Sequence, residues 1–545
     1  MITILVLLSL LAADVQQHDP HATAAEKPAT LMTSLGRLHH PIATRSAEAQ
    51  RFFDQGLTLV YGFNHDEAMR SFRRAAELDP SSPMPHWGIA LALGPNINLD
   101  VDPEREQAAY GEAQRAHALA SSAPANERAY VDALVTRYSN DPKADLKALA
   151  VQYKDAMRDL IRQYPNDLDA ATLYAESLMD LHPWQLWSAA GKPTEGTEEI
   201  VAALESVLRR DAMHVGANHY YIHAVEASGT PDRALASAKR LETLVPAAGH
   251  LVHMPAHIYM RTGDYEGAVT SNARAAEVDR AYIKSTGAAG VYPSMYYNHN
   301  LDFLASAAMM SGQFKEAKLA ADMVVANATP MIAQMPMLEP FGAKTLYVLL
   351  RFARWDDVMR LPQPDATHTL LTTLSHFGRG VAQAARGSVA DAEKERAAYA
   401  DARKAIVPDS DWGYNKAKAM LAVTDAALDA WIARAKHDDL ASIDAWRTAA
   451  LAEDVLNYDE PPDWFYPTRE SLGAALLRAK QFDRAEQAFR EDLTRNPGNG
   501  RSLFGLWQTR LATRKSSDRA AVAAAEKQFR EAWKHADVAL RLEDF

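Results

Sequence analysis

Residues 216–229 read GANHYYIHAVEASG, and residues 249–263 read GHLVHMPAHIYMRTG. Each stretch contains one His-x-x-x-His pair, and the second pair follows the first by 34 residues, member for member. A period of 34 residues is the length of a repeat made of two helices and their turns. The same pattern therefore stands twice at one point of a structural repeat, as His219 with His223 and His253 with His257.

A third copy of this repeat follows after a longer gap. A shift of 49 residues aligns His250 with His299, and it brings Asp302 to the position of His253. The 15 additional residues fall in the link 279–293. Three successive helices are therefore expected to carry imidazole or carboxylate groups at equivalent places.

Small and aromatic residues near both ends of the chain follow the same repeat. Small residues let the two helices of a hairpin approach closely, and proline ends the second helix. In residues 51–80 these positions are Gly56, Ala68, Phe72, Ala75 and Pro80. In residues 466–497 they are Gly473, Ala485, Phe489 and Pro497.

This pattern resembles the tetratricopeptide repeat. The resemblance implies an all-α, right-handed solenoid of about a dozen helical hairpins, and helical segments of varying fidelity fill the chain between the two ends. The motifs NHYYIHAVE and GHLVHMPAHIY also resemble those of a group of bacterial tetratricopeptide proteins. That second resemblance covers nearly the whole chain after its first residues, and it implies an unusual groove but no particular reaction.

Composition restricts the kinds of protein that this chain can be. A repeat solenoid can reach 545 residues without splitting into separate domains. The net charge of -12 argues against a nucleic-acid partner. The chain has no cysteine, which excludes disulfides and thiolate metal sites. Phosphate-binding loops, dinucleotide-binding motifs and serine-hydrolase motifs are also absent from the sequence.

The first residues resemble a secretory signal. Residues 2–13 read ITILVLLSLLAA, an apolar run that falls short of the roughly 20 residues needed to span a bilayer. The sequence predicts a signal segment over 1–24, a flexible linker over 25–45 and the solenoid over 46–545, with no stable membrane span. The expected location is periplasmic or secreted, or cytoplasmic if the apolar run is not a signal.

The histidine pairs predict a metal site. Rotation of about 100° per residue places His219, His223 and Glu226 on one stripe of a first helix, the stripe that faces the concave groove in tetratricopeptide arrays. Neighbouring first helices pack about 10 Å apart, so imidazoles from both can converge on one ion. The predicted ligands are His219, His223, His253 and His257. Possible additional ligands are Glu226, His250, His299, Asp302 and Glu176.

Nitrogen and oxygen ligands of this kind suit a divalent transition metal, and zinc, iron, manganese and copper all remain open. The sequence favours a binding protein that takes a protein, a peptide or a small molecule in its groove. One alternative is a hydrolytic or oxidative metalloenzyme, with Glu226 and His299 as candidate catalytic residues. The other is a metal-free scaffold whose histidines hydrogen-bond a peptide or one another.

Longer links interrupt the repeat period at residues 181–194 and 458–467. Loops of this length in a repeat array often lie over one face and carry function. Trp184 and Trp187 in the first link are candidates to form a wall of the site or to pin the loop to the solenoid.

Overall fold

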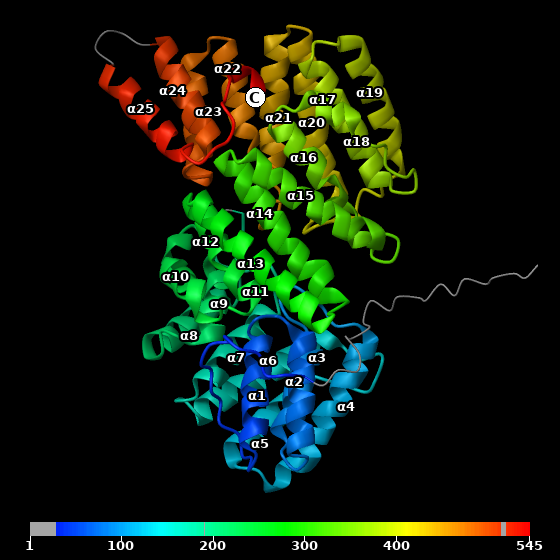
Figure 1. The fold of residues 1–545 in the computed structure, drawn as a ribbon, viewed down its shortest axis with the longest axis vertical. Coiled ribbons are helices and arrows are strands. Elements are labelled where there is room, and N and C mark those ends of the chain that lie inside the picture. Colours follow the sequence, from blue (N-terminus) through cyan, green and yellow to red (C-terminus); the bar gives the residue numbers. More distant parts are fainter. Residues whose placement is uncertain (1–28, 190, 514–518) are drawn as a thin grey trace, which may run out of the picture.

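The computed structural model describes residues 29–189, 191–513 and 519–545. Within these ranges the regular structure is helical apart from one short antiparallel pair, β1 (Asp411–Trp412) with β2 (Asn415–Lys416). The predicted all-α fold is therefore confirmed. Figure 1 shows the helices stacked along the long axis of the molecule, with the N-terminal helices at one end and the C-terminal helices at the other.

Successive helices pair in about a dozen hairpins, as predicted. The first four hairpins are α1 (Ala47–Val60) with α2 (His65–Leu78), α3 (Met84–Leu93) with α4 (Pro103–Leu119), α5 (Ala125–Val135) with α6 (Leu146–Gln163), and α7 (Leu168–Met179) with α8 (Thr197–Arg210). The central ones are α9 (Val215–Val225) with α10 (Leu235–Leu244), α11 (Gly249–His253) and α12 (Pro255–Thr262) with α13 (Tyr265–Thr286), and α14 (Tyr297–Ser311) with α15 (Phe314–Ala328).

The C-terminal hairpins are α16 (Lys344–Arg351) with α17 (Trp355–Arg360), α18 (Thr369–Ala385) with α19 (Val389–Ala402), α20 (Ala417–Ala435) with α21 (Asp439–Glu453), α22 (Thr468–Arg478) with α23 (Phe482–Arg495), and α24 (Gly500–Thr513) with α25 (Arg519–Ala532). No described helix is both long enough and apolar enough to cross a membrane.

Phenylalanine rings seated on glycines explain the tetratricopeptide-type packing. Phe72 of α2 is fully buried between Gly56 of α1 and Gly88 of α3. A Cβ atom at these two glycines would lie 2.5 and 2.6 Å from the ring, closer than real Cβ atoms approach. Phe489 of α23 sits in the same way between glycines of α22 and α24. At each end of the solenoid, one phenylalanine ring thus packs against its own hairpin and against the next hairpin.

The segment before α1 is packed along its described part. The sequence predicted a flexible linker over 25–45, but within residues 29–45 the side chains of Leu35 and Ile42 are buried. Ser34 accepts a hydrogen bond from the Ala247 backbone N–H at 3.1 Å. These contacts hold the segment against the solenoid because it can bury apolar side chains there. The predicted signal segment, residues 1–24, lies outside the described residues.

The solenoid winds back onto its own central hairpins. Phe63, just after α1, packs against the ring of His219 with centroids 4.6 Å apart. From the other end of the chain, the Asp537 backbone N–H donates to the Gly312 carbonyl oxygen at 3.1 Å. In Figure 1 helices α9 to α13 accordingly lie between the N-terminal and the C-terminal hairpins. This winding covers the inner side of the central hairpins, so side chains on the groove stripe become buried.

Candidate metal centre

Six histidines from three consecutive hairpins meet in the interior. Helix α9 carries His219 and His223, α11 carries His250 and His253, α12 carries His257, and α14 carries His299. Helices α11 and α12 are separate because Pro255 has no N–H to continue the hydrogen-bond ladder. The resulting break lies between His253 and His257 and sets the angle between their side chains.

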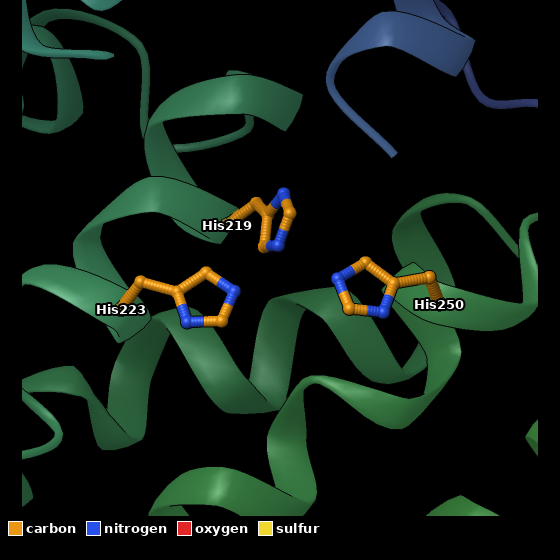
Figure 2. A group of neighbouring side chains, drawn as sticks. All are labelled: His219, His223 and His250. Carbon is orange, nitrogen blue, oxygen red and sulfur yellow. The ribbon is translucent and has the colours of Figure 1, made fainter. Parts of the chain in front are cut away.

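His219, His223 and His250 form the first group, triad A. Each offers a ring nitrogen within 4.8 Å of those of the other two. Figure 2 shows the three rings, two from α9 and one from α11, turned toward a common space. All three residues are at most 5% exposed. Triad A is therefore a set of three nitrogen donors shielded from solvent.

Hydrogen bonds determine which nitrogen is free in two rings of triad A. His219 Nδ1 lies 2.6 Å from the carbonyl oxygen of Tyr61, which can only accept, so Nδ1 carries the hydrogen. His223 Nδ1 donates to Glu226 Oε1 at 2.7 Å. Both Nε2 atoms therefore bear lone pairs, and both are buried without a hydrogen-bond partner in the described part of the chain. Both ring nitrogens of His250 are also buried without a partner, so its ring can present a lone pair from either one.

His253, His257 and His299 form the second group, triad B. One ring nitrogen of each lies within 4.8 Å of those of the other two. His253 and His257 are fully buried, and His299 is partly exposed. Triad B is adjacent to triad A, since the rings of His250 and His253 lie 5.4 Å apart.

The hydrogen-bond partners of triad B also fix its free nitrogens. The Asn272 amide donates to the Ala268 carbonyl oxygen at 2.8 Å, so its oxygen faces His253 Nδ1, which donates at 2.7 Å. His257 Nδ1 donates to Glu226 Oε2 at 2.5 Å. The Nε2 atoms of His253 and His257 therefore both carry lone pairs, and they lie 2.9 Å apart. Two lone pairs repel at this distance, so the contact needs a proton or a cation.

Glu226, at the end of α9, joins the two triads. Its two carboxylate oxygens accept from His223 and His257, and Oε2 also accepts from the Tyr458 hydroxyl at 3.3 Å. Burial works against ionisation, but His257 and His223 outweigh it and hold the pKa of Glu226 well below its usual range. A carboxylate on the far nitrogen of an imidazole fixes the ring and raises its basicity, as in many metal sites.

Burial also keeps four of the imidazoles neutral. Desolvation, with neighbouring imidazoles adding to it, lowers the pKa of His219 and of His250 well below the usual value. The same causes lower the pKa of His253 strongly and that of His299 to about 3. These rings are uncharged at neutral pH, which is the state in which histidine binds metal.

Two long links cover the outer side of the centre. The ring of Trp184 meets His223 edge to face at 5.6 Å and packs against Tyr414 at 5.0 Å. Trp187 donates from its indole N–H to the Ala224 carbonyl oxygen at 2.8 Å. The cavity that remains between Trp184, His223, Glu226 and Tyr458 measures about 20 Å³. That is room for about one water molecule.

The structure divides the four predicted ligands differently from the expected single site. His219 and His223 lie in triad A, and His253 and His257 lie in triad B. A third group places His223 and His257 with Glu226, and no described group contains all four histidines. Each triad is completed by a residue that the sequence placed among the possible additional ligands, His250 in one and His299 in the other.

Two of the possible additional ligands stand apart from the triads. Asp302 pairs with Lys344, whose Nζ lies 2.8 Å from Oδ2. Glu176 is buried beside Asp180, and burial together with that neighbour raises its pKa well above the usual value. Neither belongs to a histidine group in the described ranges.

Sequence reasoning missed the partners that orient the rings. The contact with Asn272 could have been predicted, because Asn272 lies on the helix that pairs with the His253 helix in one hairpin. Tyr61 is 158 residues from His219, and Tyr458 is 232 residues from Glu226. The only sequence signal for Tyr458 was its position in a long link.

Comparisons with known proteins give no family for this chain. No family profile matches it, and no curated protein matches it. Similar solved structures include the APC/C hetero-tetramer Cut9–Hcn1, at 11% identity over 90% of this chain and 95% of that chain, with a TM-score of 0.28. The TPR domain of P58(IPK) has 11% identity over 86% and 100%, with a TM-score of 0.21. Naa15/Naa10 bound to HypK-THB has 10% identity over 90% and 90%, with a TM-score of 0.24.

The fold assignment accordingly rests on the hairpins and glycine-seated phenylalanines of this chain itself. The resemblance of its histidine motifs to a bacterial group is not confirmed by these comparisons.

Proposed function

We propose that this chain is a tetratricopeptide-type solenoid that binds a divalent transition-metal ion through buried histidines. The observation that carries the proposal is the set of unpartnered ring nitrogens in triad A. A buried polar atom without a partner costs roughly 1–3 kcal/mol, and triad A gathers several such atoms in one place. A bound ion would satisfy one nitrogen of each ring together.

The geometry of triad A is compatible with a small ion. Metal–nitrogen bonds of about 2.0–2.1 Å in tetrahedral arrangement put ligand nitrogens about 3.4 Å apart. The nitrogens of triad A lie within 4.8 Å of one another, so inward shifts of less than about 1 Å each would reach that spacing. Imidazole donors suit zinc, copper and iron better than manganese, which prefers oxygen ligands.

The surroundings favour an ion that is held within the fold. Three protein ligands leave one tetrahedral position open, as in catalytic zinc sites. The neighbouring cavity of about 20 Å³ admits about one water molecule and no organic substrate. We therefore rank the binding-protein function above the metalloenzyme alternative. The exposed solenoid surface is the ordinary place for a protein or peptide partner of such an array.

Elemental analysis of protein purified without a histidine tag tests this proposal. Metal-stripped protein reloaded with zinc and then desalted should retain at least one ion per chain. His250→Phe should lose an ion while staying folded, because neither nitrogen of His250 has a hydrogen bond to lose and phenylalanine preserves the ring. His117→Phe, at an exposed position on α4, is the matched control and should retain full metal content. Wild-type protein without metal, or unchanged content in His250→Phe, would refute the proposal.

Export is proposed separately, on the apolar run of residues 2–13. Expression with this run should give protein outside the cytoplasm that is shortened by about 13–24 residues, in keeping with a secretory signal. Full-length protein confined to the cytoplasm would contradict export.

A further inference from the structure

We infer that triad B binds a second ion and that Glu226 couples the two sites into one dinuclear centre. This inference rests on the proposed metal binding by triad A. It concerns the divalent ions that prefer nitrogen donors, and zinc serves as the probe.

The contact between His253 and His257 favours a bound cation. Their Nδ1 atoms donate hydrogen bonds to Asn272 and Glu226, so both Nε2 atoms carry lone pairs. The two Nε2 atoms lie 2.9 Å apart. A cation bound by both nitrogens converts this repulsion into attraction. It would also move the nitrogens to about 3.4 Å, the spacing that bonds of about 2.0–2.1 Å require.

Triad B offers three nitrogen donors, as triad A does. His299 comes from α14, and its ring centroid lies 4.8 Å from that of His253 and 5.8 Å from that of His257. The three ring nitrogens lie within 4.8 Å of one another, the same spread as in triad A. Two independent sets of three imidazoles therefore stand side by side, and α11 contributes one ring to each.

The two triads share one carboxylate, that of Glu226. Glu226 accepts from the Nδ1 atom of one ligand in each triad, through a different oxygen in each case. An ion in either triad polarises its imidazole and strengthens the Nδ1–H···O bond to Glu226. The negative charge between the two sites also offsets the mutual repulsion of two cations. Occupancy of each site thus depends on the same side chain.

Glu226→Gln changes this arrangement without removing a ligand. A glutamine has one carbonyl oxygen, and its NH₂ group cannot accept from an Nδ1–H. Either His223 or His257 must lose its partner or move its hydrogen to Nε2, where it blocks metal binding. Loss of such a partner costs about 10–100-fold in metal affinity. Glu205→Gln is the matched control. Glu205 lies on α8, outside the triads, and its carboxylate accepts from the hydroxyl of Tyr221 on α9.

Native mass spectrometry of the full chain loaded with zinc, together with chelator competition, tests the inference. Wild-type protein should carry two ions, and His250→Phe and His299→Ala should each carry one. Glu226→Gln should weaken binding at one site or both by about tenfold or more, and Glu205→Gln should match wild type. Circular dichroism establishes that each variant is folded, and cobalt(II) absorbance gives a second count of the sites.

The outcomes separate this inference from the proposed function. Wild-type protein with no ion overturns both. One ion that is lost in His250→Phe and kept in His299→Ala leaves the proposed function standing and overturns the second site. Two ions whose affinities are unchanged in Glu226→Gln overturn the coupling.

Discussion

The Nε2 atoms of His253 and His257 face each other at 2.9 Å in the interior of the solenoid, although both carry lone pairs. The two residues are one helical turn apart, but Pro255 between them interrupts the turn and separates α11 from α12. The contact between their Nε2 atoms requires a proton or a metal ion to be stable.

Replacing the proline between the two histidines should weaken triad B. Pro255→Ala supplies the missing N–H and lets α11 and α12 join, which changes the angle between the two imidazoles. We expect zinc binding at one site to weaken several-fold while the other site and the overall fold are kept. Isothermal titration of the metal-stripped protein measures both sites, with Pro231→Ala, outside the triads, as the control. Two unchanged affinities in Pro255→Ala would contradict this role of the break.

Metal should stabilise the folded chain by mass action, because the triads exist only when the hairpins are assembled. A free ion concentration 100 times the dissociation constant adds about 2.7 kcal/mol to the free energy of unfolding for one site. The melting temperature should therefore fall by a few degrees on chelation and recover on addition of zinc. Scanning calorimetry measures this difference. The same melting temperature with and without chelator would count against binding to the folded state.

Acidification should destabilise the metal-free protein through the buried imidazoles. Desolvation lowers the pKa of His250 in the folded chain, whereas unfolding returns it to about 6.5. Below about pH 6.5 the unfolded chain binds a proton that the folded chain does not, so the free energy of unfolding falls as the pH falls. Burial acts oppositely on nearby carboxyls: it raises the pKa of Asp279 and of Glu460 to about 7, so their contribution to stability increases toward acid.

Comparison of two proteins isolates the histidine contribution. Metal-free His250→Phe should lose less stability than wild type between about pH 6.5 and pH 5, by up to about 1.4 kcal/mol per pH unit. Urea unfolding at a series of pH values measures the difference. Parallel pH profiles for the two proteins would show that His250 titrates normally in the fold.

The packing of phenylalanine on glycine gives a test of the fold itself. Gly56→Ala places a Cβ atom 2.5 Å from the Phe72 ring, and overpacking of this kind costs about 1–3 kcal/mol. Gly111→Ala, on the exposed face of α4, meets nothing within 4 Å and should stabilise the helix by about 0.5–1 kcal/mol. Chemical denaturation compares the two. Equal changes in the free energy of unfolding would mean that the packing of Phe72 on Gly56 does not hold the first hairpins together.

The fold was predictable because its signals are local and repeated. The 34-residue period and the spacing from Gly56 to Phe72 follow from the geometry of a single hairpin. The four histidines at His-x-x-x-His spacing were found for the same reason, since one turn of helix puts both members on one face.

The division into two triads was not predictable, because it depends on longer-range geometry. His250 and His299 were recognised as candidates, but the triad that each one completes depends on how α9, α11, α12 and α14 pack against one another. The groove stripe was expected to face open space. The winding of the solenoid instead brings Phe63 and Tyr458 onto it from segments far away in the sequence.

The most direct test of the metal centre is a crystal structure of the zinc-loaded, tag-free protein with anomalous data collected at the zinc edge. We predict one anomalous peak between the Nε2 atoms of His219 and His223 and a ring nitrogen of His250, and a second peak at triad B, each about 2.0–2.1 Å from its ligand nitrogens. Zinc found only at exposed histidines, with both triads empty, would contradict the account.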